Sequence, residues 1–312
     1  MATVSEVLEV AQGRPGVAGR LWRQPSGRAG LIILGVMVLA GLASLAGLAP
    51  DAPDVQNPLV TLRGPTAAHL FGTDQFGRDV LSRVMAGTVL SLQTALLAVA
   101  ICAVAGTLGG VAAGYFGGVV SWAVTSLADL IFAVPSVLLA LAIVSGLGPG
   151  WQNTAIAVGI SYTPIFIRVV RGPVLAIRQA DYVRAAQVLG FSRSRILFRH
   201  VLPGVGGILA VQVTLALGWA VLIEASLDFL GLGPPPPAAT LGLMVSEGTN
   251  IAGIAWWNLA FPAVAVVLLV LGFTLTGDGL RDALDPSGSD RLWTLRCFRS
   301  ETCRSGCGPG PG

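Results

Sequence analysis

The chain has 312 residues, of which 54% are hydrophobic and only 11% are charged, and its mean hydropathy is +0.76. Soluble domains typically carry about 25% charged residues, so this composition excludes an ordinary soluble domain. The formal net charge of +3 gives no indication of a nucleic-acid-binding surface. An all-α protein that crosses a membrane several times is predicted.

Uncharged apolar runs define the predicted spanning helices. A spanning helix needs roughly 20 apolar residues, because about 30 Å of hydrocarbon is crossed at about 1.5 Å per residue. Six spans are expected, with one between Arg83 and a glycine-rich turn at 114–118 and the next running from that turn to Gly146. The other four are expected at residues 29–50, 151–169, 201–223 and 254–275. An even number of crossings places both termini on the same side.

Three features lie within these predicted spans. Pro135 is expected to bend the third span, because proline disrupts helical hydrogen bonding. Asp129 lies in the same span, and an intramembrane acid is either a partner in helix packing or part of a transport pathway or gate. Small residues recur at every fourth position of the second span and predict a close helix–helix contact within the chain. These residues are Ala98, Cys102, Gly106, Gly110 and Gly114.

The basic residues indicate the orientation. All 19 are arginines, and 16 of them fall before the first predicted span, around residues 168–199 or after the last span. Only Arg63, Arg78 and Arg83 fall on the opposite side. By the positive-inside rule the side with 16 arginines is cytoplasmic, so both termini are predicted to be cytoplasmic.

The two ends of the chain are expected to add little structure. The composition of residues 1–28 predicts a loosely ordered cytoplasmic lead, and that of residues 287–312 predicts a disordered tail. Reading the first apolar run as a cleaved signal peptide would leave five spans and contradict the arginine pattern. The tail carries Cys297, Cys303 and Cys307, whose spacing fits no common zinc site, although a redox or metal role stays open.

Common enzymatic motifs are excluded by composition. A Walker A phosphate loop requires a lysine, which this chain does not contain. His69 and His200 are predicted on opposite sides of the membrane, so they cannot share a site. No catalytic, cofactor-binding or metal-binding residue is therefore expected in this chain, and if transport is driven by ATP, another subunit must hydrolyse it.

The loop at residues 171–203 is rich in arginine and is expected to be structured. Asp181 can cap a short helix that Gly190 can end. Tyr182, Ala185, Ala186 and Leu189 follow the spacing of one apolar helix face. This face predicts a contact with a partner protein.

At this loop the sequence resembles the permease subunits of bacterial ABC importers. Ala185–Ala186, Gly190 and Leu202–Pro203 resemble the loop by which such permeases dock onto their ATPases, with Arg184 in place of a glutamate and His200 in place of an isoleucine. Three further segments, 72–83, 224–233 and 277–286, resemble the branch that transports dipeptides, oligopeptides and nickel. The resemblance covers residues 30 to 286 or thereabouts.

The resemblance implies a C-type permease in the bacterial cytoplasmic membrane. It implies a heterodimer with a B-type permease, two ATPase subunits that bind ATP and Mg²⁺, and an extracytoplasmic solute-binding protein. Dipeptides or oligopeptides are the implied solutes, with nickel chelates or another small solute as the alternative. The implied coupling residues are Asp181, Tyr182, Ala185, Ala186, Leu189, Gly190, Leu202 and Pro203. At the outer face, Leu241 replaces a usual tryptophan and residues 234–237 form a tetraproline, so substrate release is harder to infer there.

Two carboxylates lie near the outer end of the fifth span. Glu224 and Asp228 are one helical turn apart and are expected to be solvated rim charges, or alternatively to contact a peptide amino terminus. The predicted organisation is therefore a lead (1–28), a transmembrane permease domain (29–286) and a tail (287–312). Within the domain, outer loops are expected at 50–83 and 224–250 and a coupling loop at 171–203.

Two other classes remain as distant alternatives. A secondary transporter would be expected to show inverted repeats or paired broken helices, and the sequence shows neither. A membrane-embedded enzyme would need convergent catalytic groups, whereas few ionisable residues fall within the predicted spans.

Overall fold

The computed structural model describes residues 17–284, and their regular elements are helices, with one isolated bridge between Thr73 and Asp79. The tail and its three cysteines lie outside the described residues. The helices are α2 (Val17–Arg23), α3 (Pro25–Leu45), α4 (Val80–Phe116), α5 (Gly118–Phe132), α6 (Ser136–Leu147), α7 (Trp151–Gln179), α8 (Asp181–Val188), α9 (Arg193–Ile196), α10 (Leu202–Phe229), α11 (Leu241–Ile251) and α12 (Trp257–Leu284). A short 3₁₀ helix, η1 (Pro58–Val60), precedes α4, and a π-helical turn, η2 (Leu197–Val201), joins α9 to α10.

Five of the six predicted membrane crossings are confirmed, and the sixth depends on the pair α5 and α6. α3, α4, α7, the continuous segment Arg193–Phe229 and α12 are each long and apolar enough to span a membrane. α5 and α6 together reach that length, but they meet at an angle of 88°, so the count is six only if this pair forms one crossing. Pro135 leaves the helical conformation with φ −52° and ψ 130° just before α6. The predicted bend is therefore a break in the helix.

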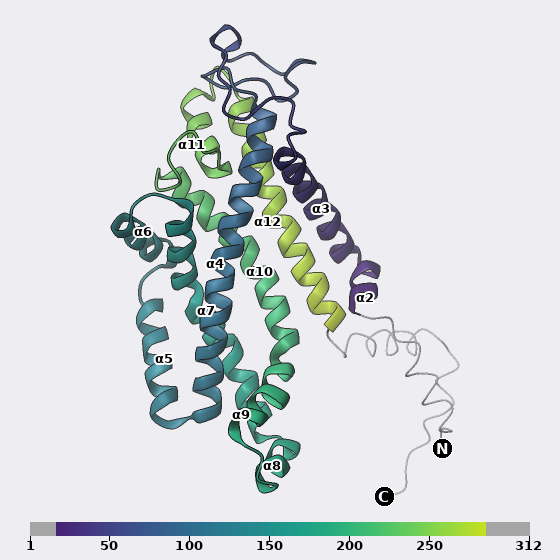
Figure 1. Ribbon diagram of the computed structural model, residues 1–312, viewed down its shortest axis with the longest axis vertical. Helices are drawn as coiled ribbons and strands as arrows, with labels where there is room; N and C mark the ends of the chain where they lie inside the picture. The colour runs from purple at the N-terminus through teal and green to yellow at the C-terminus, as the bar shows by residue number, and fades with distance from the viewer. Residues whose placement is uncertain (1–16, 285–312) are drawn as a thin grey trace, which may run out of the picture.

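The N-terminal lead is more ordered than predicted. Residues 17–23 form α2, and α3 starts at Pro25, earlier than the expected start at residue 29. The Arg20 guanidinium donates a hydrogen bond of 3.3 Å to the Ala283 carbonyl near the end of α12. The two ends of the described chain thus lie side by side, with α2 against α12 (Figure 1).

The row of small residues on α4 forms the contact with α7. All five residues of this row are buried. A Cβ atom on Gly110 would lie 2.8 Å from the Ile167 carbonyl oxygen, and one on Gly114 would lie 2.7 Å from Val174 Cγ1. Because no side chain separates the two backbones at these positions, the helices approach closely. The prediction that this row serves packing within the chain is confirmed.

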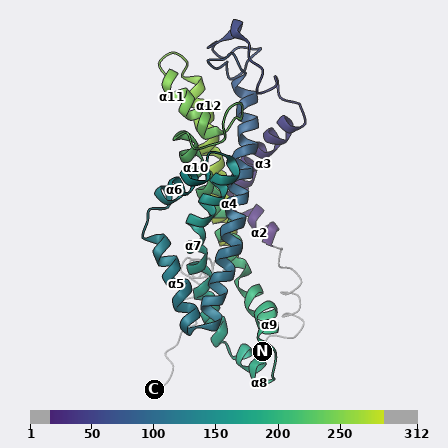
Figure 2. The same cartoon turned by 60° about the vertical axis from the view of Figure 1, so that its left-hand side comes forward.

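The helices form an elongated bundle with two different ends (Figure 1). α8 and α9 lie at one end, called here the α8 end, while α11 and the segment 46–79 lie at the other, the α11 end (Figures 1 and 2). α4, α7, α10 and α12 pack together along the middle, with α3 against α12 and α5 against α4 and α7. Large apolar side chains such as Leu39, Trp122 and Leu130 are exposed on the outer helices, which suits a lipid environment.

Candidate functional site

The helix α8 begins differently from the sequence prediction. Ala180, in an extended conformation, precedes the helix, and no side chain caps it. Asp181 is the first residue of α8, where its negative charge suits the helix dipole. The prediction that Asp181 is the capping residue is therefore wrong, because the chain turns into the helix one residue earlier.

The end of α8 agrees with the prediction. Gly190 adopts a positive φ of 78°, which a residue with a Cβ atom rarely tolerates. The Gly190 N–H donates to the Gln187 carbonyl at 3.0 Å, and the Phe191 N–H donates to the Ala186 carbonyl at 3.1 Å. This pair of bonds is a Schellman motif, which satisfies the last carbonyl groups of the helix and turns the chain sharply towards α9.

The apolar face of α8 divides into an inner and an outer part. Val183 and Ala186 are buried in a cluster with residues of α4, α7, η2 and α10. Ala186 is only 4% exposed, so the prediction that it lies on the outward contact face is wrong. The exposed apolar residues are Tyr182, Ala185, Val188 and Leu189. Val188 is 87% exposed and Leu189 is 73% exposed. These four residues are called the α8 outer face below.

The loop is physically continuous with a membrane-spanning helix. The Ser192 side chain caps α9, and the Leu202 N–H donates to the Leu197 carbonyl in the wider π-helical spacing. Pro203 follows, and its missing N–H and bulky ring disfavour the ordinary α-helical pattern at this point. Leu202 and Pro203 are thus the first residues of α10, and the helical path from α9 through η2 into α10 is unbroken.

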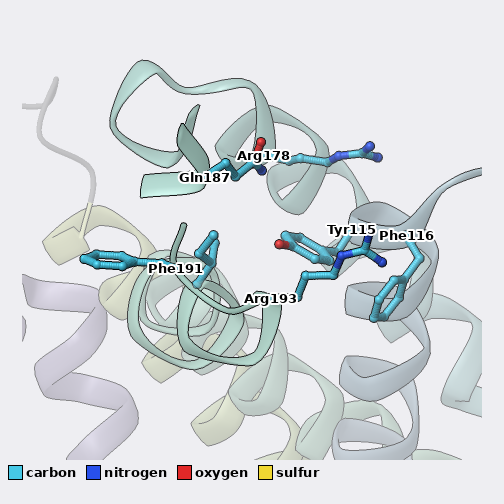
Figure 3. A pocket seen from close by; sticks show the side chains of 7 residues that line it. Tyr115, Phe116, Arg178, Gln187, Phe191 and Arg193 are labelled. Atoms are coloured by element: carbon cyan, nitrogen blue, oxygen red, sulfur yellow. The ribbon is translucent and has the colours of Figure 1, made fainter. Parts of the chain in front are cut away.

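A polar cleft of about 400 Å³ separates the loop from the end of α4. Figure 3 shows its lining side chains, which include Arg178 from α7, Arg193 from α9 and Tyr115 and Phe116 from α4. Gln187, Phe191 and Ile196 complete the lining. Reasoning from the sequence missed this cleft, because its residues come from four helices and from the turn between α8 and α9.

Glu224 and Asp228 are not solvated rim charges. Both side chains are 1% exposed on α10, and Glu224 Oε1 accepts a hydrogen bond of 3.0 Å from Ser91 Oγ of α4. α11 packs over this part of α10, and a Cβ atom on Gly242 would lie 2.7 Å from Ala225 Cα. The predicted solvent exposure is wrong because Asp228 packs under α11 and Glu224 faces α4. The alternative of a direct contact with a peptide is disfavoured, because both carboxylates are buried in this conformation.

Asp129 pairs with an arginine of the neighbouring helix. Its Oδ1 lies 2.6 Å from Arg168 Nη2, which joins α5 to α7. The Arg168 guanidinium also lies over the Phe132 ring at 4.2 Å. Both charged side chains are more than half exposed, so the pair lies on the bundle surface. This geometry favours the alternative in which Asp129 is a helix-packing partner.

Buried ion pairs fix the start of α4 at the α11 end. Arg78 Nε lies 2.6 Å from Asp74 Oδ2, and Arg83 Nη2 lies 3.4 Å from Glu247 Oε2 of α11. The Thr73 carbonyl accepts bonds from Trp257 Nε1 at 3.1 Å and from the Asn258 side chain at 3.2 Å. Segment 72–83 is therefore tied to α11 and α12, with Glu247 as a partner that the sequence did not indicate.

Taken together, the fold and the loop define a polytopic helical membrane protein with a structured loop at the α8 end that presents an apolar surface. Residues 105–289, more than half of the chain, match the family "Binding-protein-dependent transport system inner membrane component". The chain belongs to this family. It is therefore a membrane transport permease subunit and not an enzyme.

Curated relatives agree with the family. The "Dipeptide transport system permease protein DppC" of Alkalihalophilus pseudofirmus is 44% identical over 74% of this chain and 76% of its own length. The "Putative peptide transport system permease protein" of Brucella suis is 38% identical over 86% of this chain and 90% of its own length. The "Glutathione transport system permease protein GsiD" of Escherichia coli O6:K15:H31 is 44% identical over 72% of this chain and 74% of its own.

A solved structure shares the fold. One chain of the MetNI methionine ABC transporter, in an inward-facing conformation, matches with a TM-score of 0.55 and 18% sequence identity. The match covers 65% of this chain and 97% of the other. At this identity the likeness shows the ABC importer permease fold, and the predicted fold class is confirmed.

Proposed function

We propose that this chain is the C-type permease of an ATP-driven importer for dipeptides or oligopeptides. Relatives named for dipeptide, peptide and glutathione transport support a peptide substrate over nickel chelates or another small solute. A B-type permease completes the pathway, two ATPase subunits bind ATP and Mg²⁺, and a solute-binding protein delivers the solute. Purifying that binding protein and identifying its bound ligand tests the substrate class, and a nickel chelate in its place would overturn the peptide assignment.

The observation that carries the coupling role is the α8 outer face. Val188, the last residue of α8, and Leu189, its C-cap, are largely exposed, although most of the surrounding loop surface is polar or charged. Exposed apolar groups at the end of a membrane bundle cannot be covered by lipid tails, so a protein partner is the natural cover. The loop continues through η2 into α10, which gives the partner a route for moving a spanning helix.

Replacing Leu189 with glutamate should detach the ATPase subunits. The exposed leucine would no longer fill an apolar groove of the partner, and a carboxylate would be desolvated there without a counter-ion, which costs several kcal/mol. Each loss of about 1.4 kcal/mol lowers affinity about tenfold. We therefore expect ATPase recovery on purification, and transport, to fall at least about tenfold, with the permease amount in the membrane unchanged.

The matched control is Leu189→Met, which keeps an apolar side chain of similar size and should retain the ATPase subunits and transport. Recovery of ATPase with Leu189→Glu at the parental level would remove the docking role from the α8 outer face. Recovery lost in both variants would show that the site depends on leucine shape and not on exclusion of charge.

Orientation is the second part of the proposal, with the α8 end cytoplasmic. Support comes from the arginines of the described chain, because the α8 loop alone carries Arg184, Arg193, Arg195 and Arg199. After masking of the native thiols, a cysteine at Thr61 should react with an impermeant thiol reagent in intact cells, whereas one at Ser192 should react only after lysis. The reverse pattern would overturn the orientation and place the docking face outside the cell.

A further inference from the structure

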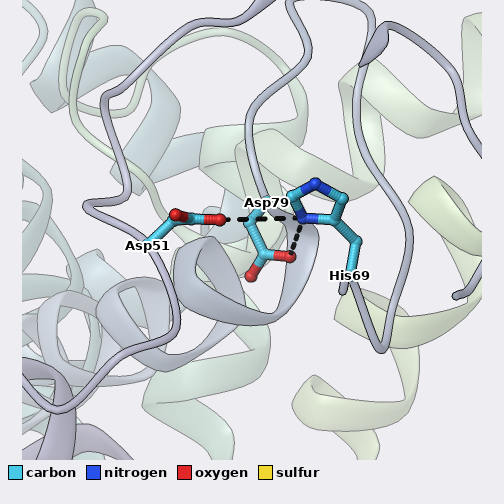
Figure 4. A group of neighbouring side chains, drawn as sticks. All are labelled: Asp51, His69 and Asp79. Atoms are coloured by element: carbon cyan, nitrogen blue, oxygen red, sulfur yellow. Dashed lines mark hydrogen bonds and ion pairs between the residues drawn. The ribbon is translucent and has the colours of Figure 1, made fainter. Parts of the chain in front are cut away.

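Three side chains that bind metal ions in other proteins converge at the α11 end (Figure 4). His69 Nδ1 lies 3.1 Å from Asp79 Oδ1 and 3.7 Å from Asp51 Oδ2. One ligand atom of each residue lies within 4.8 Å of the other two. The Asp79 side chain is 1% exposed, that of His69 is 20% exposed and that of Asp51 is 49% exposed. The cluster is therefore buried at Asp79 and open to solvent at Asp51.

Hydrogen bonds hold two of these residues through one serine. Ser82 Oγ donates to Asp79 Oδ2 at 2.8 Å and accepts from the Asp51 N–H at 3.1 Å. The Ser82 N–H donates to the same Asp79 oxygen at 2.8 Å, which is the N-cap bond of α4. Because these bonds occupy Oδ2, the other oxygen of Asp79 stays directed at the imidazole. Contacts of this kind orient the ligands of protein metal sites.

The histidine is fixed by its backbone. The His69 carbonyl accepts from the Thr66 N–H at 2.8 Å and from the Gly72 N–H at 3.0 Å, which makes a tight turn around His69. Gly72 has a φ of 75°, and a Cβ atom there would lie 2.7 Å from both the Arg63 carbonyl oxygen and Trp257 Nε1. The turn that carries His69 is thus set by packing against α12. The imidazole is then held at the start of α4 by its contact with Asp79, and this placement does not require Asp51.

We propose that Asp51, His69 and Asp79 bind one divalent transition-metal ion of the Zn²⁺ class. A tetrahedral ion with ligands at about 2.0–2.2 Å separates neighbouring ligand atoms by about 3.3 Å. The observed separations of 3.1 and 3.7 Å lie on either side of that value. One imidazole nitrogen with two carboxylate oxygens suits Zn²⁺ or Co²⁺, whereas Ca²⁺ and Mg²⁺ prefer oxygen ligands throughout and Cu(I) prefers sulfur.

Hydrogen bonding alone accounts for only one of the two contacts. The 3.1 Å contact between His69 Nδ1 and Asp79 Oδ1 is short enough for a hydrogen bond, whereas the 3.7 Å separation between Nδ1 and Asp51 Oδ2 is too long for one. A single ion can draw all three atoms into contact and leave its fourth position on the open side for water. The ion joins the segment that precedes α4 to the first turn of that helix. This proposal does not depend on the solute that the importer carries.

The binding test uses the full chain purified without a histidine tag and with Cys297, Cys303 and Cys307 replaced by serine, which removes the tail thiols as competing ligands. After chelator treatment, Co²⁺ should bind at one ion per chain and give the visible absorption of a four-coordinate site, and Zn²⁺ should displace it. Zn²⁺ should also raise the thermal unfolding midpoint, because an ion that binds only the folded state stabilises it.

His69→Gln should remove the Co²⁺ absorption, the bound ion and the Zn²⁺-dependent rise in unfolding midpoint. The matched control is His200→Gln, which removes the only other histidine, at the α8 end, and should leave all three readouts unchanged. Asp51→Asn should weaken Co²⁺ binding at least about tenfold, as loss of one ligand predicts. Its control, the nearby exposed Asp54→Asn, should bind as the parent does.

Three results would overturn the proposal. The first is a folded parent chain that binds no Co²⁺ or Zn²⁺ at micromolar concentration. The second is an ion retained by both His69→Gln and Asp51→Asn. The third is an ion lost equally from the His200→Gln control. Should His69→Gln elute as aggregate, the exposed Asp51→Asn variant decides the matter alone, since its side chain is half exposed and makes no bond that holds a helix.

Discussion

Replacing Gly106 with leucine is expected to abolish the folded protein, because α4 and α7 could then no longer meet. A Cβ atom at this position would overlap Phe166 Cβ and would lie 2.9 Å from the Thr163 carbonyl oxygen. These are backbone or backbone-proximal atoms, which cannot move aside as the tip of a flexible side chain can. Overpacking costs about 1–3 kcal/mol when neighbours can adjust, and leucine adds three carbons beyond the Cβ. Size-exclusion chromatography of a fluorescent fusion should show little monodisperse protein.

The control for this prediction is Gly35→Leu in α3. A Cβ atom at Gly35 meets nothing within 4 Å, so the same substitution in another spanning helix should give a yield near that of the parent. Equal and high yields from both variants would contradict the close contact between α4 and α7. Equal losses would indicate that any added bulk in a spanning helix is harmful, which the packing argument does not predict.

The spanning helices and the glycine contact could be predicted because both depend on local sequence. Length and hydropathy define a span directly, and small residues at Gly106, Gly110 and Gly114 fall on one side of α4 by the helical period alone. The partner helix was not predictable from this row. Its identity depends on Phe166 and Val174 of α7, which the fold brings against the glycines from about 60 residues away.

The region around Pro135 shows a limit of hydropathy. Residues 118–147 are apolar enough for one straight span, but the chain bends by 88° between α5 and α6. A proline within a helix can give a mild kink or a complete break, and the surrounding packing decides between them. The sequence therefore predicted the position of the distortion but not its size.

The errors at Ala186 and at Glu224 share one cause, which is tertiary packing. The spacing of Tyr182, Ala185 and Ala186 fits one broad face, and nothing local tells which alanine turns inward. Val183 and the later residue Ile196 decide it by drawing Ala186 into their cluster. Glu224 lies on α10 and is buried with its carboxylate against Ser91 of α4, and nothing in the residues next to Glu224 in the sequence indicates that contact.

The metal ligands were missed for a related reason. The sequence directed attention to His69 and His200 as a pair, and their predicted separation excluded a shared site. The carboxylates that meet His69 lie 18 residues before it and 10 residues after it, at Asp51 and Asp79. The turn at 66–72 and the bridge between Thr73 and Asp79 bring His69 to Asp79, and the bond from the Asp51 N–H to Ser82 brings Asp51 to the same place.

Ala186→Glu is expected to unfold the α8 loop, whereas Ala185→Glu should leave it folded. Ala186 is 4% exposed in a cluster with Val183, Ile196 and Val201, so a glutamate here would place its carboxylate among apolar side chains. Burying an unpaired charge costs several kcal/mol, which exceeds what a helix of eight residues can supply. The neighbouring Ala185 is exposed, so a glutamate at this position stays in water.

Limited proteolysis with trypsin measures the difference, because the loop contains Arg184, Arg193, Arg195 and Arg199 as cleavage sites. A compact loop resists cleavage in proportion to its stability against local opening, and a loss of about 2.8 kcal/mol raises the open population about a hundredfold. We expect rapid cleavage in the Ala186→Glu permease and parental resistance in Ala185→Glu. The Ala185→Glu permease should nevertheless lose its ATPase subunits, since its carboxylate interrupts the α8 outer face. If Ala186→Glu resists trypsin as the parent does, the inward orientation of Ala186 is incorrect, and the division of α8 into a packing side and a docking side must be abandoned.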